Sequence, residues 1–274
     1  MKKTLMKSLL LAAFALGTQN VSAQKVAVDD AVATNIQPNM SVGQKFYYEA
    51  IVYQITAANG SKYNVKAIGF YDGEVKEAVE IIGSGSANGA DFVVDEIAAL
   101  NSALALSGTD FVSGDASTLA EIELIDFIAD GGFEGTIAAG AFANLSGLTD
   151  IQVAAETPCT AEAGCFATAI QNNVKLSVPV SNLGTVAGKY ATADGWKQMK
   201  RIYTQGDDFA YGDFDCSGSI NTSDTAELAK YVKARGNYQG TYNAHSVDID
   251  GSGKNNTSDT AELAKQIKAR ARKV

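Results

Sequence analysis

The sequence predicts a mixed α and β chain in which a strand-rich region is followed by a small all-α domain. Residues 46–55 and 63–70 are rich in aromatic and β-branched residues, which is typical of strands. Short segments with apolar residues at alternate positions then recur through the middle of the chain. The last sixty or so residues contain one segment written twice, with helical spacing of its apolar positions. A charged leader precedes all three features.

The leader has the three parts of a secretory signal peptide. Three lysines precede an apolar run at residues 9–16, and the small residues 21–23 follow. We therefore expect residues 1–23 to be removed and the protein to be secreted, or held at the cell surface through a partner. No cysteine stands at the cleavage position, which argues against a lipid anchor. No other run reaches the roughly 18 apolar residues of a membrane span, so no membrane insertion is expected.

Removing the leader and its three lysines takes the formal net charge from −9 to −12. Nucleic acids and anionic membranes bind cationic surfaces, so we expect neither as a partner. The three cysteines allow few disulfides. Cys159 and Cys165 lie in a predicted loop and are either bonded or free, whereas Cys216 falls inside one of the duplicated segments.

The strand-rich region is expected to span residues 24–205 and to begin with a β-hairpin turned at Asn59-Gly60. Residues 75–82 form a further extended run. Leu119–Leu124 and Leu148–Val153 then share one apolar pattern, Val174–Val178 keeps its alternation, and an earlier copy is possible around 93–100. Since one such turn cannot bury its apolar face alone, neighbouring turns are expected to stack into a β-solenoid.

Two segments of this region carry a family resemblance. Ala141–Ile151 resembles the "AF-x-x-x-x-x-L-x-x-I" repeat of BspA-like leucine-rich-repeat surface proteins. Residues 176–202 resemble the segment that caps such arrays, in which Trp196 would cover the last core rather than stack on a ligand. The resemblance implies a leucine-rich-repeat solenoid that binds protein or glycan and has no catalytic centre.

The duplicated segments, 213–224 and 248–259, have the spacing of twelve-residue calcium loops. Oxygen-bearing side chains stand at positions one, three, five, nine and twelve, a carbonyl is available at seven, and glycine occupies six. Two Ca²⁺ ions are predicted. The expected ligands are Asp213, Asp215, Ser217, the Ser219 carbonyl, Asn221 and Asp224 in the first loop, and Asp248, Asp250, Ser252, the Lys254 carbonyl, Asn256 and Asp259 in the second. The alternative is a pair of acidic turns that bind no metal.

A helix is expected after each loop but not before it. The helices are expected at residues 225–235 and 260–270, and the duplicated segments that contain them, 221–235 and 256–270, are identical at thirteen of fifteen positions. A duplicated loop-plus-helix unit with Thr-Ser at positions ten and eleven resembles the dockerin domain, here residues 206–274, which implies docking onto a cohesin domain. The matching partner-binding positions are Thr222, Ser223, Lys230, Thr257, Ser258 and Lys265. A half-turn rotation presents nearly the same surface, so either repeat could engage one partner.

The predicted function is that of an exported, non-catalytic adaptor, tethered by the dockerin while the preceding domain binds protein or glycan. The alternative is a dockerin-bearing polysaccharide-degrading enzyme, because carboxylate pairs cannot be located from spacing alone. The only histidine, His245, lies just before the second loop, which disfavours Ser-His-Asp and Cys-His mechanisms. A calcium sensor is disfavoured because the incoming helices that would have to open are missing.

Overall fold

The computed structural model describes residues 36–107, 110–127 and 133–271. These belong to one compact unit, Ala33–Val274. The predicted signal peptide lies outside the described residues. No helix in the described part of the chain is long and apolar enough to cross a membrane.

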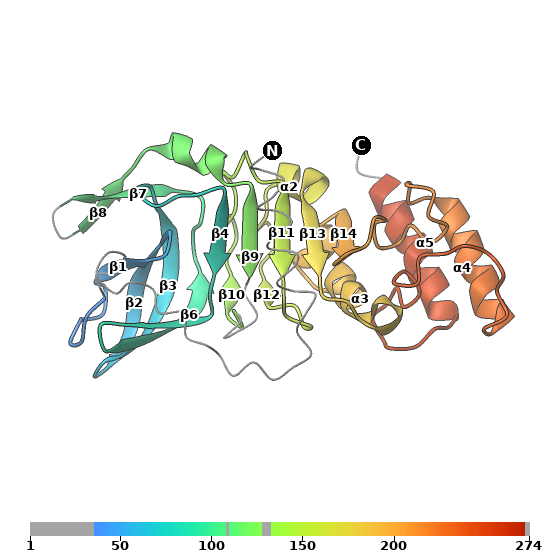
Figure 1. The fold of residues 1–274 in the computed structure, drawn as a ribbon, viewed down its shortest axis with the longest axis horizontal. Helices are drawn as coiled ribbons and strands as arrows, with labels where there is room; N and C mark the ends of the chain where they lie inside the picture. The colour runs from blue at the N-terminus through green and yellow to red at the C-terminus, as the bar shows by residue number, and fades with distance from the viewer. Residues whose placement is uncertain (1–35, 108–109, 128–132, 272–274) are drawn as a thin grey trace. The chain divides into compact units, whose positions relative to one another are not determined.

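The elements run in sequence from a strand-rich part to a helical part (Figure 1). The strands are β1 (Lys45–Tyr48), β2 (Ile51–Asn59), β3 (Lys62–Tyr71), β4 (Ala78–Ile81), β5 (Ser84–Ala87), β6 (Ala90–Ile97), β7 (Ala103–Ser107), β8 (Asp110–Ser113), β9 (Leu124–Phe127), β10 (Thr136–Ile137), β11 (Asp150–Val153), β12 (Thr160–Ala161), β13 (Lys175–Val178) and β14 (Arg201–Thr204). The α-helices are α2 (Thr168–Asn173), α3 (Thr185–Thr192), α4 (Thr222–Ala234) and α5 (Thr257–Ala271), and the 3-10 helices are η1 (Ala116–Glu121), η2 (Asn182–Gly184) and η3 (Trp196–Gln198).

The predicted hairpin is confirmed. Strands β2 and β3 pair antiparallel, with Asn59 opposite Lys62 across the turn. The expected first strand is divided, because Glu49 adopts a positive φ of 53° and separates β1 from β2. These strands open a nine-stranded sheet with the path β1-β2-β3-β6-β10-β12, to which β5, β7 and β8 are attached.

A second sheet has five strands in the order β14-β13-β11-β9-β4. All of its pairs are parallel. Parallel neighbours require long crossover connections, which explains why these strands are separated by intervening loops and short helices in the sequence. In this sheet Glu80 of β4 lies opposite Asp126 of β9, and Asp126 lies opposite Gln152 of β11.

The predicted leucine-rich-repeat solenoid is wrong. The described residues show no clear solenoid of that kind, and the strands belong instead to two extensive sheets. The first half of the expected repeat strand at 119–124 lies in the 3-10 helix η1, and the expected early copy around 93–100 overlaps β6, which pairs antiparallel with β5. Alternating apolar residues show that one face of a strand is buried, but they do not specify which strand lies beside it.

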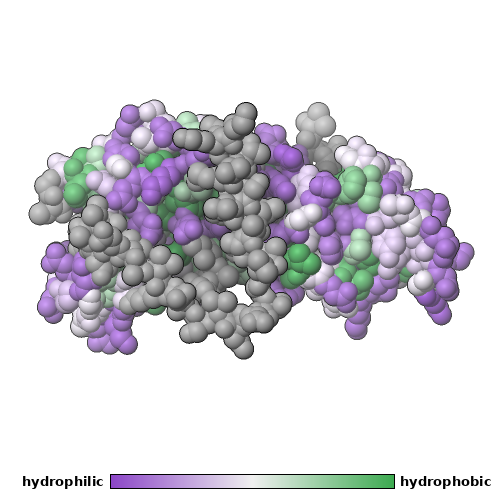
Figure 2. All heavy atoms as spheres, viewed as in Figure 1, coloured by the Kyte–Doolittle hydropathy of each residue, from purple (hydrophilic) through white to green (hydrophobic). Residues whose placement is uncertain are grey.

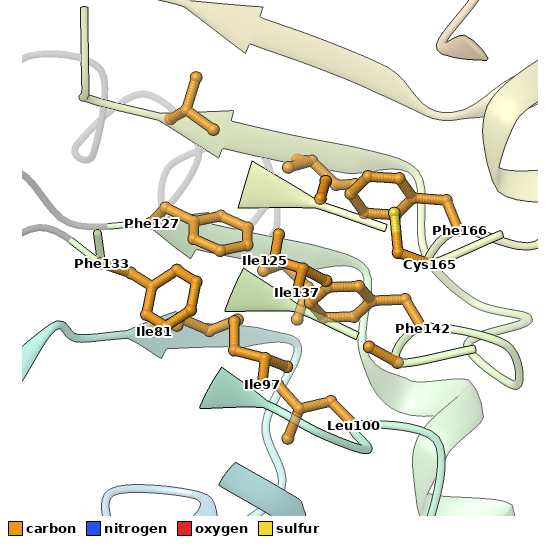
Figure 3. Packing of buried hydrophobic residues seen from close by; sticks show 14 of the residues in the cluster. Ile81, Ile97, Leu100, Ile125, Phe127, Phe133, Ile137, Phe142, Cys165 and Phe166 are labelled. Atoms are coloured by element: carbon orange, nitrogen blue, oxygen red, sulfur yellow. The ribbon is translucent and has the colours of Figure 1, made fainter. Parts of the chain in front are cut away.

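The main core contains side chains from strands of both sheets. In Figure 3, Ile81 and Ile125 of the parallel sheet lie near Ile97 and Ile137 of the mixed sheet. Trp196 is a core residue rather than the cap of a solenoid, because it is only 1% exposed and its indole Nε1 donates to the Cys159 carbonyl over 2.9 Å. That burial leaves no face of Trp196 for ligand stacking.

Cys159 and Cys165 do not form a disulfide in the structure, and both are free thiols. Burial raises the pKa of the Cys159 thiol to about 12 and that of Cys165 to about 11. Neither sulfur is therefore a reactive thiolate near neutral pH.

Asp126 is a buried carboxyl group in the parallel sheet, 5% exposed, with no hydrogen-bond partner for Oδ1 among the described residues. Burial, together with the facing carboxyl group of Glu80, raises its pKa to about 6. The folded state holds the proton more tightly than the unfolded chain, so ionisation of Asp126 costs stability as pH rises from about 4 through 6. We expect Asp126→Asn to raise the free energy of unfolding by about 1–2 kcal/mol at pH 7.5.

Urea denaturation of the wild type and of Asp126→Asn at several pH values, in saturating calcium, measures the difference in their free energies of unfolding. The advantage of Asp126→Asn should shrink as pH falls through 6 towards 4. Glu80→Gln provides a matched change in the facing strand, and it should give a smaller gain by lowering the pKa of Asp126. An Asp126→Asn advantage that stayed constant from pH 4 to 7.5 would contradict the assignment.

Candidate calcium-binding loops

The last residues of each duplicated loop already belong to a helix, because α4 and α5 begin three residues before their predicted starts. The Asn221 side chain caps α4 by accepting from the Ser223 amide over 2.8 Å, and the Asp224 carboxylate accepts from the Asn221 amide over 2.7 Å. The same pair of bonds recurs at Asn256, where each distance is 2.8 Å. Such reciprocal capping satisfies amides that the first helical turn leaves unpaired, which explains why these polar residues begin a helix.

Each loop brings three carboxyl groups together. Ligand-capable oxygens of Asp213, Asp215 and Asp224 all lie within 4.8 Å of one another, and those of Asp248, Asp250 and Asp259 do the same. Positions one and twelve of both loops are at most 1% exposed. Sequence spacing thus located both acidic clusters, whereas the ligand assignments themselves remain predictions.

The carboxylate at position one of each loop accepts hydrogen bonds from the backbone of the turn at positions five and six. Asp213 accepts from the amides of Ser217 and Gly218 over 3.0 and 2.8 Å, and Asp248 accepts from the corresponding Ser252 and Gly253 over 2.9 and 2.7 Å. The glycines at position six have φ values of 83° and 77°. This left-handed conformation favours glycine, so the position-six signal has a direct structural cause.

The third loop position is connected to the first turn of the helix. The Ser223 hydroxyl donates to Asp215 over 2.6 Å, and the Ser258 hydroxyl makes the equivalent bond to Asp250. The Ser223 bond is the main reason that the pKa of Asp215 is lowered. For Asp250, burial opposes ionisation, but bonds from Ser258 and Ser252 prevail and the pKa is also lowered.

The carboxyl groups at position twelve have the opposite shift. Burial raises the pKa of Asp224 and of Asp259, with further contributions from neighbouring loop carboxylates. None of the ion pairs found among the described residues supplies a cation to either loop. A hard divalent cation fits such an all-oxygen donor set, because it would offset the mutual repulsion of three close carboxylates.

The remaining predicted ligands lie around these clusters. Ser217, Ser219, Ser252 and Lys254 are exposed. The Ser219 carbonyl accepts from the Ser217 hydroxyl over 3.2 Å and from the Asn221 amide group over 3.0 Å, which brings positions five, seven and nine together.

The predicted partner-binding residues are all exposed on α4 and α5. Lys230 and Lys265 each form an ion pair with the glutamate three residues earlier in the helix. The set comprises Thr222, Ser223, Lys230, Thr257, Ser258 and Lys265. Since Ser223 and Ser258 also bond to loop carboxylates, the surface and the metal loops are structurally connected.

An aromatic cluster around the first repeat was not predicted. Phe214 packs against Tyr231 of α4 and against Tyr238 and Tyr242 of the segment between the repeats, with ring centroids 5.5 to 6.1 Å apart. The Tyr238 hydroxyl also donates to Glu227 over 2.8 Å. The spaced tyrosines 238 and 242 were the available signal for this cluster.

The contact of the second loop with residues 183–188 was also not predicted. The amides of Val247 and Asp248 both donate to the Leu183 carbonyl, over 3.3 and 3.0 Å. A Cβ atom added to Gly188 of α3 would lie 2.6 Å from both the Asp248 carbonyl oxygen and the Gly251 amide nitrogen. The backbone of the second loop therefore lies directly against α3.

These paired loops, each followed by one helix, agree with a comparison against protein families. Residues 211–268 match the model of the dockerin type I domain. A dockerin domain implies calcium-dependent binding to a cohesin partner. The match covers the helical region alone, and no comparison supports the BspA-like leucine-rich-repeat assignment of the preceding region.

Other comparisons give little further information. No curated protein matches the chain. Among solved structures, a chain from "The Crystal structure of Pneumococcal vaccine antigen PcpA" shows 14% identity and a TM-score of 0.25, covering 60% of this chain and 39% of that one. The present chain thus spans well under half the length of that structure.

Proposed function

We propose that this protein is an exported, non-catalytic adaptor. Its dockerin region, residues 206–274, attaches it to a cohesin domain of a scaffold protein, and each loop holds one Ca²⁺ ion. The preceding sheet region, residues 24–205, binds protein or glycan. The observation that carries the proposal is the pair of carboxylate clusters, each coupled through a serine hydroxyl to an exposed helix.

The surface of the helical region suits a polar docking interaction. On the face shown in Figure 2, hydrophilic residues cover much of this region, and hydrophobic residues form small separate patches. The threonine, serine and lysine side chains at the predicted positions offer hydrogen bonds and positive charge. A folded partner with complementary acceptors fits this chemistry better than a membrane or a nucleic acid.

A polysaccharide-degrading enzyme remains the second candidate because of one observation. Glu80 and Asp126 face each other on adjacent strands, and the pKa of each is raised, mainly by burial. Glycosidases use such a carboxyl pair within a substrate cleft. The cavities beside Trp196 and beside α5 are lined by neither carboxyl group. The adaptor function therefore has the stronger support.

A calcium-dependent pull-down tests the adaptor proposal. The tagged full chain should capture a cohesin-bearing protein from the secretome of its source organism in calcium and release it in excess EDTA. The double variant Asp213→Ala/Asp248→Ala should capture none, whereas Asp194→Ala, which removes an exposed carboxylate outside the loops, should behave as the wild type. Equal capture with and without calcium would contradict the proposal, and hydrolysis of polysaccharide by the purified chain would favour the enzyme.

A further inference from the structure

The two repeats are nearly identical in sequence but have different surroundings. In the helices, one of the two differences is Tyr231 against Gln266. Tyr231 packs into the aromatic cluster with Phe214, Tyr238 and Tyr242, all from the helical region. Gln266 instead lines a cavity shared with the preceding sheet region. The two helices therefore differ in sequence at a position where their neighbours also differ.

That cavity has a volume of about 410 Å³ and lies beside the docking face of α5. Its α5 wall includes Glu262, Lys265 and Ala269, and Asp250 of the second loop contributes as well. The opposite wall is formed by Ala191 and Thr192 of α3, residues 197–200 and Ile202. Lys265, one of the predicted partner-binding residues, therefore stands at the edge of a groove whose other side belongs to the sheet region.

The segment that enters the second loop lies against the sheet region through backbone contacts. Leu183 accepts two amide bonds from the segment that enters the second loop, and a Cβ atom at Gly184 would lie 1.7 Å from the His245 carbonyl oxygen. His245 also pairs with Asp207 over 2.9 Å. These contacts place the second repeat, but not the first, directly against the sheet region.

We infer that the partner docks in one orientation only, with α4 as the contacting helix. This inference rests on the proposed cohesin-binding function. A specific interface buries about 800 Å² on each partner, which extends well beyond one helix. A footprint centred on α5 would include the wall that carries Lys197 and Lys200, whereas the α4 side chains described above contact residues of the helical region.

The two orientations consequently differ in energy. Docking on α5 would desolvate Lys197 and Lys200 or force the partner away from Lys265, and each of these costs affinity. Docking on α4 places Thr222, Ser223 and Lys230 at the centre of the contact. The internal symmetry of the helical region therefore does not extend to the whole chain.

Matched hydroxyl deletions in the full chain test this inference. The probe is the calcium-dependent partner captured by the wild-type chain, and its Kd is measured by surface plasmon resonance. Thr222→Ala/Ser223→Ala should weaken binding by at least about 30-fold. Thr257→Ala/Ser258→Ala should weaken binding far less, and by no more than its loss of calcium affinity at the second loop accounts for. Calcium titration of both variants controls for the equivalent loss of a hydroxyl bond to Asp215 or Asp250.

The outcomes separate the two proposals. If each pair of substitutions leaves binding intact and only the fourfold variant loses it, docking occurs in both orientations, so the inference is wrong while the proposed function stands. A loss confined to the α5 pair, or an equal loss in both pairs, also overturns the choice of α4. If the wild-type chain captures no partner in calcium, the proposed function fails and the inference with it.

Discussion

Removal of calcium is expected to unfold the helical region. Asp213, Asp224, Asp248 and Asp259 are at most 1% exposed, and each belongs to a cluster of three carboxyl groups within 4.8 Å. Without a cation, each loop must either bury repelling charges or take up protons. Ion binding therefore contributes directly to folding, and its contribution is about 4 kcal/mol when free calcium exceeds Kd a thousandfold.

Far-UV circular dichroism and thermal melting measure this loss. In excess EDTA at pH 7.5, the helical signal from α4 and α5 should decrease and the melting temperature of the region should fall. Calcium in excess should restore both, while the sheet signal changes less. Asp224→Ala and Asp259→Ala should each remove one binding step from a calcium titration. A melting curve unaffected by EDTA would show that the loops fold without metal.

The helical region was well predicted because its signals are local. The glycines at position six and the acidic spacing each act within twelve residues of chain. Such constraints depend little on the rest of the fold, so they can be inferred from the sequence alone. The hairpin at Asn59-Gly60 was predicted for the same reason.

The sheets were predicted less well because strand pairing is decided over long distances. The pairing of β4 with β9 joins Ala78 to Leu124, and no local pattern specifies it. For the same reason the packing of the second loop against α3 was not predicted, because Gly188 and Asp248 are close in space but sixty residues apart in the sequence. Gly188 lies inside α3, and a glycine within a helix is a weak signal, since its usual effect is only to lower helix stability.

Gly188→Ala is expected to separate the second loop from α3. In an isolated helix this substitution stabilises by about 1 kcal/mol. Here the new Cβ would lie 2.6 Å from two backbone atoms of the loop, Asp248 O and Gly251 N, which cannot move like flexible side-chain ends. Overpacking of this kind costs about 1–3 kcal/mol, so we expect a net loss of stability in calcium and weaker ion binding at the second loop.

The sign of the effect should depend on calcium, which supplies an internal control. Denaturation of Gly188→Ala is compared with that of the wild type in calcium and in EDTA. In EDTA the second loop no longer holds its backbone against α3, so the helix preference of alanine should make the substitution neutral or stabilising. A destabilisation of the same size in both conditions would mean that Gly188 is required by the sheet region itself. Destabilisation only in calcium would establish that the metal-loaded loop packs against this helix.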